Sequence, residues 1–224
     1  SEYGTAVTTT NLLRGTSMVP IDPIAAERVG YNAGKSVDRL AKTALDVASV
    51  TYDDASTTSI QEIGSSSEYL NSYLLQEGVS LLEEANVRPF MSEAYVLVVS
   101  PKQAQHLKAE NTNQGWRYVT ARNEGAGMNS IYRGEIGMYE GVRIVVNNNL
   151  GASNVAYLMG AEALAKVHSD APGFGPNPRT VVSPVVDKLR RFASIGWYHL
   201  VGYSVFRPEA LIRIETASTL KPAS

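Results

Sequence analysis

Three histidines are the side chains of this sequence best suited to acid–base or metal chemistry: His106, His168 and His199. His106 and Glu110 lie four residues apart on a predicted helix, so both side chains fall on one face at a spacing that a metal ion could use. One such pair is common by chance, and we interpret it as an ordinary surface pair. His168 follows a predicted strand and lies near Asp170, but no suitably placed nucleophilic serine accompanies it.

The other motif-like stretches are incomplete. Gly125-Ala126-Gly127 carries two of the three glycines of a dinucleotide-binding fingerprint and follows no convincing strand. Asp53-Asp54 and Glu83-Glu84 are adjacent pairs, which do not face one site on a helix or strand and are typical of solvated charge. We therefore predict no catalytic, cofactor-binding or metal-binding residue, no cofactor and no enzymatic activity. An enzyme of unknown type that uses His168 or the His106–Glu110 pair is the least favoured alternative.

A basic cluster stands directly before a group of aromatic residues: Lys188, Arg190, Arg191, Phe192, Trp197 and Tyr198. For the basic cluster, a solvated surface or a salt-bridge site between copies is favoured over nucleic-acid contact. The aromatic residues are expected to anchor a core or an interface. Twelve tyrosines against four phenylalanines are also typical of protein–protein contact surfaces.

Composition excludes several classes of protein. The 224 residues are 44% hydrophobic and 19% charged, which excludes a disordered chain, and a net charge of −2 excludes a polycation that coats nucleic acid. Cysteine is absent, so disulfides, thiolate metal sites and cysteine nucleophiles are excluded. No apolar run reaches the roughly 18–20 residues that cross a bilayer. The chain begins Ser1-Glu2-Tyr3-Gly4, without Met or a signal peptide, so we expect that an N-terminal part was processed off, truncated or not included.

The elements that would position these residues are a mixture of helices and strands. Residues 1–22 are rich in threonine and suit an exposed strand or an extended arm. Asp22-Pro23 is a good helix start, and apolar residues then recur at helical spacing as far as about residue 50. A helix over about 23–50 would be ~40 Å long at about 1.5 Å per residue, which is typical of a strut.

The remaining pattern predicts short elements without a repeating β–α alternation. Helices are expected from near Ser67-Glu68 to Asn86–Pro89, and from Ser100-Pro101 to about Glu110. Strands are expected at 95–99, 142–146, 155–159, 195–206 and 210–214, with loops at 52–66, 111–133 and 172–178. Glycines at 134, 137 and 141 indicate tight turns or close backbone approach beside a strand. The predicted fold class is α+β.

Charge is unevenly distributed along the chain. Residues 52–93 hold eight acidic residues and one basic residue, whereas residues 179–221 hold seven basic residues and three acidic ones. The net charges of these segments are −7 and +4. Either both are solvated surface, or they are opposite faces that meet between copies of the chain, as in rings and lattices.

Several stretches resemble one protein family in order along the chain. Residues 196–215 (GWYHLVGYSVFRPEALIRIE) resemble the closing segment of the major capsid proteins of tailed phages, and among these the phage N4-type proteins. Tyr3-Gly4 with Val7 and Thr10 resembles the strand that leaves the extended loop of that family. The helix from Pro23 resembles its spine helix, and Gly134-x-Ile136-Gly137 with Gly141-Val142 resembles its glycine-punctuated strand start.

The resemblance implies an HK97-like capsid fold with two domains. Residues 1–52 and 183–207 would form a peripheral domain around the spine helix of about 23–50, and residues 67–182 and 208–224 an axial domain. The family's N-terminal arm and extended loop would be absent from this chain. A shell subunit needs no catalytic constellation, and the sequence shows none.

The function that the resemblance implies is that of a major capsid protein. Copies would self-assemble as hexamers and pentamers into the icosahedral head shell of a tailed bacteriophage and enclose double-stranded DNA by non-specific contact. Further partners would be decoration, scaffolding and portal proteins, with no membrane partner, and assembly would take place in the cytoplasm of the bacterial host. The alternative is the shell of an encapsulin-like compartment that packages an enzyme.

Overall fold

A computed structural model describes residues 1–47, 50–52, 69–90, 94–110, 135–150, 155–168, 178–183 and 191–216. The chain divides into two compact units. Unit 1 comprises Ser1–Ala41 and Lys166–Ser204, and unit 2 comprises Lys42–Ala165 and Val205–Ser224. No helix in the described ranges is both long and apolar enough to cross a bilayer.

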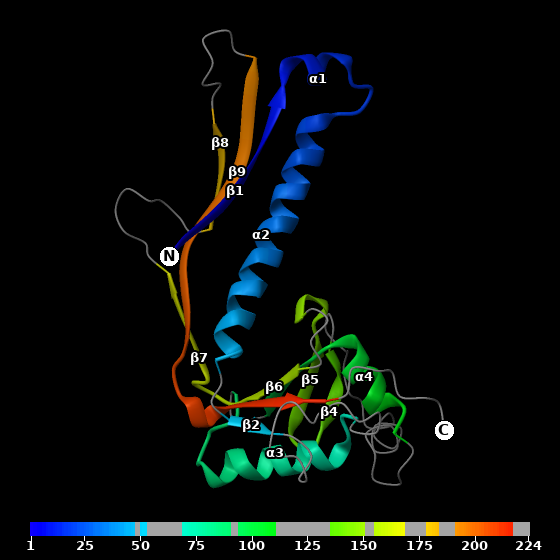
Figure 1. The fold of residues 1–224 in the computed structure, drawn as a ribbon, viewed down its shortest axis with the longest axis vertical. Helices are drawn as coiled ribbons and strands as arrows, with labels where there is room; N and C mark the ends of the chain where they lie inside the picture. Colours follow the sequence, from blue (N-terminus) through cyan, green and yellow to red (C-terminus); the bar gives the residue numbers. More distant parts are fainter. Residues whose placement is uncertain are drawn as a thin grey trace. The chain divides into compact units, whose positions relative to one another are not determined.

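The sheet of unit 1 is built around one long strand, β9 (Phe192–Val205). β1 (Glu2–Thr10) pairs with β9 antiparallel along its whole length, from Glu2 opposite Leu200 to Thr10 opposite Phe192. On the other side of β9 lie β7 (Leu164–His168) and β8 (Arg179–Ser183). Figure 1 shows β1 and β9 side by side, as two strands of an elongated sheet. The threonine-rich start of the chain is therefore an exposed strand, as predicted.

One face of this sheet is covered by α2 (Ile21–Leu45), the long helix of Figure 1. Ala25 and Val29 of α2 are buried, and Trp197 of β9 donates its indole N–H to Asn32 Oδ1 at 3.2 Å. Alternate residues of β9 are buried from Ile195 to Val201, which marks the side of the sheet that carries Trp197 as the covered one.

The long helix is confirmed, but it ends at Leu45 and not near residue 50. The reason is the β-forming triplet Val50-Thr51-Tyr52, which leaves the helix to form β2 (Val50–Tyr52) and pairs with a strand of unit 2. A short helix, α1 (Asn11–Thr16), was not predicted. Six residues are too few to show a helical period, and its cap is the Thr10 side chain, which accepts from Leu13 N–H at 3.2 Å.

Unit 2 contains a six-stranded mixed sheet in the order β2-β10-β6-β3-β5-β4. Its other strands are β3 (Tyr95–Val99), β4 (Glu135–Tyr139), β5 (Val142–Val146), β6 (Val155–Met159) and β10 (Leu211–Glu215). β10 pairs parallel with β2, and β3 pairs parallel with β5, whereas the other pairs are antiparallel. The predicted strands at 95–99, 142–146 and 155–159 are confirmed, and the α+β class with them.

Two helices accompany this sheet, α3 (Ser72–Glu84) and α4 (Pro101–Lys108). α3 begins later than predicted because Asn71 is its cap and accepts from Leu74 N–H at 2.8 Å. Ser100 and Gln103 form a capping box at the start of α4, as the Ser-Pro start indicated. Short 3₁₀ turns, η2 (Asn148–Leu150) and η3 (Pro208–Ala210), complete the described elements.

The glycines beside β4 and β5 behave as predicted. Gly141 has a φ of 73° in the turn between the two strands, and Gly137 has a φ of 150° where the β4 register shifts. Both values lie in the region that glycine adopts without a steric cost. Gly134 and most of the expected loops at 52–66, 111–133 and 172–178 lie outside the described residues, but Tyr52, expected in a loop, is the last residue of β2.

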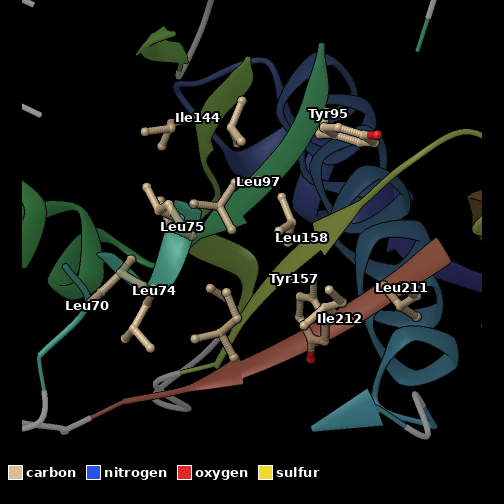
Figure 2. Close-up of a cluster of buried hydrophobic side chains, with 14 of the residues drawn as sticks. Leu70, Leu74, Leu75, Tyr95, Leu97, Ile144, Tyr157, Leu158, Leu211 and Ile212 are labelled. Atoms are coloured by element: carbon tan, nitrogen blue, oxygen red, sulfur yellow. The ribbon is translucent and has the colours of Figure 1, made fainter. Parts of the chain in front are cut away.

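The core of unit 2 is a large cluster of buried side chains from α3, α4 and the sheet (Figure 2). Leu75, Leu97 and Leu158 are fully buried in it. A methyl group on Gly78 would lie 2.7 Å from Leu158 Cδ2, so α3 packs closely against β6 at this point. Unit 2 thus has the self-sufficient core that an independent domain needs.

The unit boundaries differ from the predicted domain boundaries. Residues 42–52 group with unit 2, although the sequence analysis placed them with the long helix, because β2 pairs with β10. Residues 166–182 group with unit 1, because β8 pairs with β9. Strand pairing, which the sequence pattern does not contain, accounts for both differences.

Candidate functional surfaces

The His106–Glu110 pair is not a surface pair, because His106 of α4 is fully buried. Its imidazole packs edge-on against Tyr69, with 4.8 Å between the ring centroids. The carboxylate of Glu110 instead accepts from Ser72 N–H at 3.1 Å and from the Ser72 hydroxyl. An anion at the first residue of a helix is stabilised by the free amides there, so Glu110 fixes the start of α3 and the pair has a structural role.

His168 lies exposed at the end of β7, and its predicted neighbour Asp170 lies outside the described residues. The structure places a different histidine in a distinctive setting: His199 of β9 is only 2% exposed. Burial, and then the nearby charges of Lys166 and His168, lower the pKa of His199 below its usual value. Its burial could have been read from β9, where Ile195, Trp197, His199 and Val201 recur at every second residue.

The remaining sequence candidates do not converge on a site. Glu83 and Glu84 are exposed at the end of α3. Arg191 is exposed, and its guanidinium lies 5.6 Å from the ring centroid of Phe192, a cation–π contact. Lys188, Arg190, Asp53-Asp54 and Gly125-Ala126-Gly127 lie outside the described residues. In the parts of the chain that are described, no group of three or more acidic or histidine side chains is placed to hold a metal ion.

The aromatic residues of β9 separate by strand alternation. Trp197 is buried and faces α2, whereas Tyr198 is half-buried on the opposite face and Phe192 is exposed at the start of the strand. Trp197 is therefore a core anchor, one of the two roles predicted for these aromatic residues. Phe192 is left exposed on the surface of unit 1.

A shallow groove of about 410 Å³ lies on the sheet of unit 1. Its lining residues come from β1, β8 and β9: Gly4, Thr5, Ala6, Val181, Ser194, Gly196, Trp197 and Tyr198. Gly4 stands opposite Tyr198, and Ala6 stands opposite Gly196, so small residues form much of the floor. None of the lining side chains is a carboxylate, imidazole or amine, so the groove suits packing and not acid–base chemistry.

Asp46, just after α2, binds several polar groups of unit 2. It accepts from Lys42 Nζ at 2.9 Å and from the hydroxyl of buried Tyr157, and its carbonyl accepts from Arg213 at 3.4 Å. Burial would raise the pKa of Asp46, but the bonds from Lys42 and Tyr157 and the charges of Lys42 and Arg213 outweigh it and lower that pKa. Burial and Asp46 raise the pKa of Tyr157. These contacts hold residue 46 against β6 and β10. Both carboxylate oxygens of Asp46 accept a bond, so this carboxylate has a structural role and does not act as a catalytic base.

The predicted segregation of charge is partly cancelled within the fold. Arg207 pairs with Glu209 at 3.2 Å, and Arg213 pairs with Glu215, so two basic residues of the C-terminal segment have acidic partners in the same unit. On the acidic side, Glu83 and Glu84 remain exposed. Complementary faces that meet between copies of the chain stay a prediction.

The described surface is thus suited to packing against other molecules. Comparison with known proteins points to the same kind of role. The sequence model of a family described as phage capsid protein matches residues 4–214. No curated protein matches the sequence.

Solved structures with a similar fold are capsids and related particles. The capsid of Ralstonia phage GP4 is 14% identical with a TM-score of 0.71, over 99% of this chain and 74% of that one. The head of Helicobacter pylori bacteriophage KHP40 is 11% identical with a TM-score of 0.71, over 98% and 75%. A virus-like particle from Pyrococcus furiosus is 14% identical with a TM-score of 0.58, over 96% and 76%.

Proposed function

The chain belongs to the phage capsid protein family, and from this premise we propose that its copies associate as hexamers and pentamers that close into an icosahedral head around double-stranded DNA. The role of the chain is that of a major capsid protein with the HK97-like fold, a structural component of the virion that self-assembles into a capsid lattice. The N4-type relationship stays a prediction, since the family description does not separate subgroups.

The observation that carries this proposal is the unequal use of apolar side chains in unit 1. Among its described residues, five hydrophobic side chains are buried: Ala25, Val29, Ile195, Trp197 and Val201. Twelve large ones are exposed: Tyr3, Val7, Leu12, Leu13, Met18, Val19, Ile24, Tyr31, Val167, Val181, Val182 and Phe192. A protein that works alone rarely displays so much apolar surface, whereas a lattice subunit covers it with neighbours.

The roles of the two units and the partners of the subunit follow from its place in a shell. Unit 1 is the peripheral domain and unit 2 the axial domain of the subunit. DNA contact is non-specific, since a container need only tolerate its contents. Assembly takes place in the host cytoplasm with scaffolding, portal and decoration proteins as partners. The subunit is not an enzyme, and its buried His106 and His199 serve packing.

An encapsulin-like compartment is the second candidate, because the virus-like particle from Pyrococcus furiosus has a similar fold. The family match favours the phage head. The two candidates predict different contents for the same kind of shell: a genome in one, and a packaged enzyme in the other.

Electron microscopy of purified particles tests the proposal, combined with nuclease-protected nucleic acid and mass spectrometry of the contents. We expect closed icosahedral shells that protect double-stranded DNA. Shells that hold a stoichiometric enzyme and no genome would establish the compartment instead. A protein that stays monomeric at high concentration under assembly conditions would contradict both.

A further inference from the structure

Helix α1, the turn after it and the first turn of α2 display apolar side chains that the described residues of unit 1 leave exposed. None of the residues of α1 is buried. Leu12 is 76% exposed and Met18 is completely exposed, and Leu13, Val19 and Ile24 are exposed as well. These five residues, which we call the α1 patch, fall within thirteen positions and are five of the sixteen large hydrophobics exposed in the described parts of the chain.

The α1 patch is held in one conformation by local bonds. Thr10 caps α1, Ser17 N–H donates to Leu13 O at 3.0 Å, and Asn11 N–H ties the helix to Arg191 O at 2.8 Å. The Ser17 hydroxyl bonds the backbone of Val19 in both directions. The apolar side chains are therefore presented from a defined turn.

The charges beside the patch cancel each other. Arg14 of α1 pairs with Asp22 in the first turn of α2 at 2.8 Å, and both side chains are partly exposed. Protein interfaces have an apolar centre that is depleted in unpaired charge and surrounded by a polar rim. Leucine, valine and methionine beside a neutralised ion pair match that composition.

Helix α1 is held by its cap and by its backbone bond to Arg191, and not by burial of its own side chains. Isolated helices shorter than about 12–15 residues are marginal in water, and short helices in proteins are held by the apolar face that they bury. α1 has six residues, and none of them is buried by the described parts of the chain. Its apolar side chains are therefore free to pack against another molecule.

We propose that the α1 patch is a contact surface between copies of this chain, and that Leu12 and Met18 insert into a neighbouring subunit of the shell. The occupant is a second copy because the chain self-assembles into a capsid lattice, which supplies every subunit with identical neighbours at fixed positions. This inference rests on the proposed function.

The first test is the double variant Leu12→Ser/Met18→Ser in the intact protein. Both side chains are exposed in the free subunit, so its circular dichroism and unfolding midpoint should match those of the unchanged protein. The concentration needed for assembly, measured by sedimentation, should rise about ten-fold or more, because two apolar side chains lose their burial. The matched control is Val47→Ser/Phe206→Ser, which alters two apolar residues of unit 2 that are 75% and 68% exposed. Equal effects in both variants, or unchanged assembly in the first, would overturn the proposal.

The second test does not depend on a loss of assembly. The sequence contains no cysteine, so Met18→Cys creates a single site for a maleimide probe. Labelling should be fast in unassembled subunits and at least about ten-fold slower in shells. Equal labelling rates in shells that do form would refute the contact and leave the shell role intact. Failure of the unchanged protein to form shells would refute the shell role itself.

Discussion

Unit 1 and unit 2 are built from the same kinds of element but use their apolar residues in opposite ways. Unit 2 buries 25 hydrophobic residues among its described positions and exposes four large ones: Val47, Tyr73, Phe90 and Phe206. Unit 1 buries five and exposes twelve. Unit 2 therefore draws its stability from its own core, whereas unit 1 is one sheet with one long helix, whose apolar surface is available to neighbours.

The largest expected effect is in the core of unit 2. Leu158→Ala removes a fully buried side chain beneath α3 and should lower the free energy of unfolding of the subunit by about 2–5 kcal/mol. Chemical denaturation of the unassembled subunit measures this loss, and Val47→Ala, at an exposed position, is the control with little effect. If Leu158→Ala cost no more than the control, unit 2 would not have the independent core described here.

A smaller and more local effect is expected in unit 1. Gly196→Ala would place a methyl group 2.9 Å from Ala6 Cβ and 3.0 Å from Thr5 O, where β1 lies close to β9. Crowding of this kind costs about 1–3 kcal/mol, and β1 should loosen first because it lies at the end of the sheet order. Hydrogen exchange at β1 amides should rise while unit 2 amides stay protected.

The same strand provides the control for this change. Gly202→Ala, also in β9, meets no atom within 4 Å and should leave exchange at β1 unchanged. Equal exchange at β1 in the two variants would mean that close packing at Gly196 does not hold the strand. Exchange that rose equally in unit 2 would mean that the two units unfold together.

The smallest expected effect is a difference in pH dependence between the units. The pKa of buried His199 is lowered, so the folded unit 1 resists protonation at this site more than the unfolded chain does. This contribution to the stability of unit 1 is therefore fully present above the unfolded pKa of about 6.5 and is lost as pH falls from there through the folded value. The pKa of Asp46 is lowered as well, so its contribution to unit 2 is present above the unfolded value of 3.8 and declines only below it. Unit 1 should therefore loosen first on acidification.

Hydrogen exchange in each unit between pH 7 and pH 5 measures this difference. His199→Gln, which carries no titrating group, should flatten the response of unit 1 in that range and leave unit 2 unchanged. A response of unit 1 that is identical with and without His199 would assign the pH dependence to other groups.

Local patterns in the sequence predicted much of the secondary structure. The apolar run at 95–99 predicted β3, Ser100-Pro101 predicted the capped start of α4, and the glycines at 137 and 141 predicted unusual backbone at β4 and β5. These features depend on neighbouring residues and on local backbone sterics, which a sequence pattern contains directly. The resemblance at residues 196–215 added the family, which the match over residues 4–214 confirms.

The hydrogen-bond partners of the candidate residues depend on contacts between distant parts of the chain, which the sequence pattern does not show. Glu110 binds Ser72, 38 residues away, and Tyr157 reaches Asp46 across 111 residues. The end of α2 at Leu45 follows from a strand pair of the same non-local kind, β2 with β10. The grouping of β8 with unit 1 follows from its pairing with β9, the next strand along the chain.

The sequence by itself therefore determined the long helix, most of the strands of unit 2 and the fold family, whereas α1, β7 and β8 were not predicted. Only the tertiary structure decided which polar groups meet and which apolar residues stay uncovered. The physical reason is that periodicity identifies the buried side of an element, whereas the partner of that side depends on how the whole chain closes on itself.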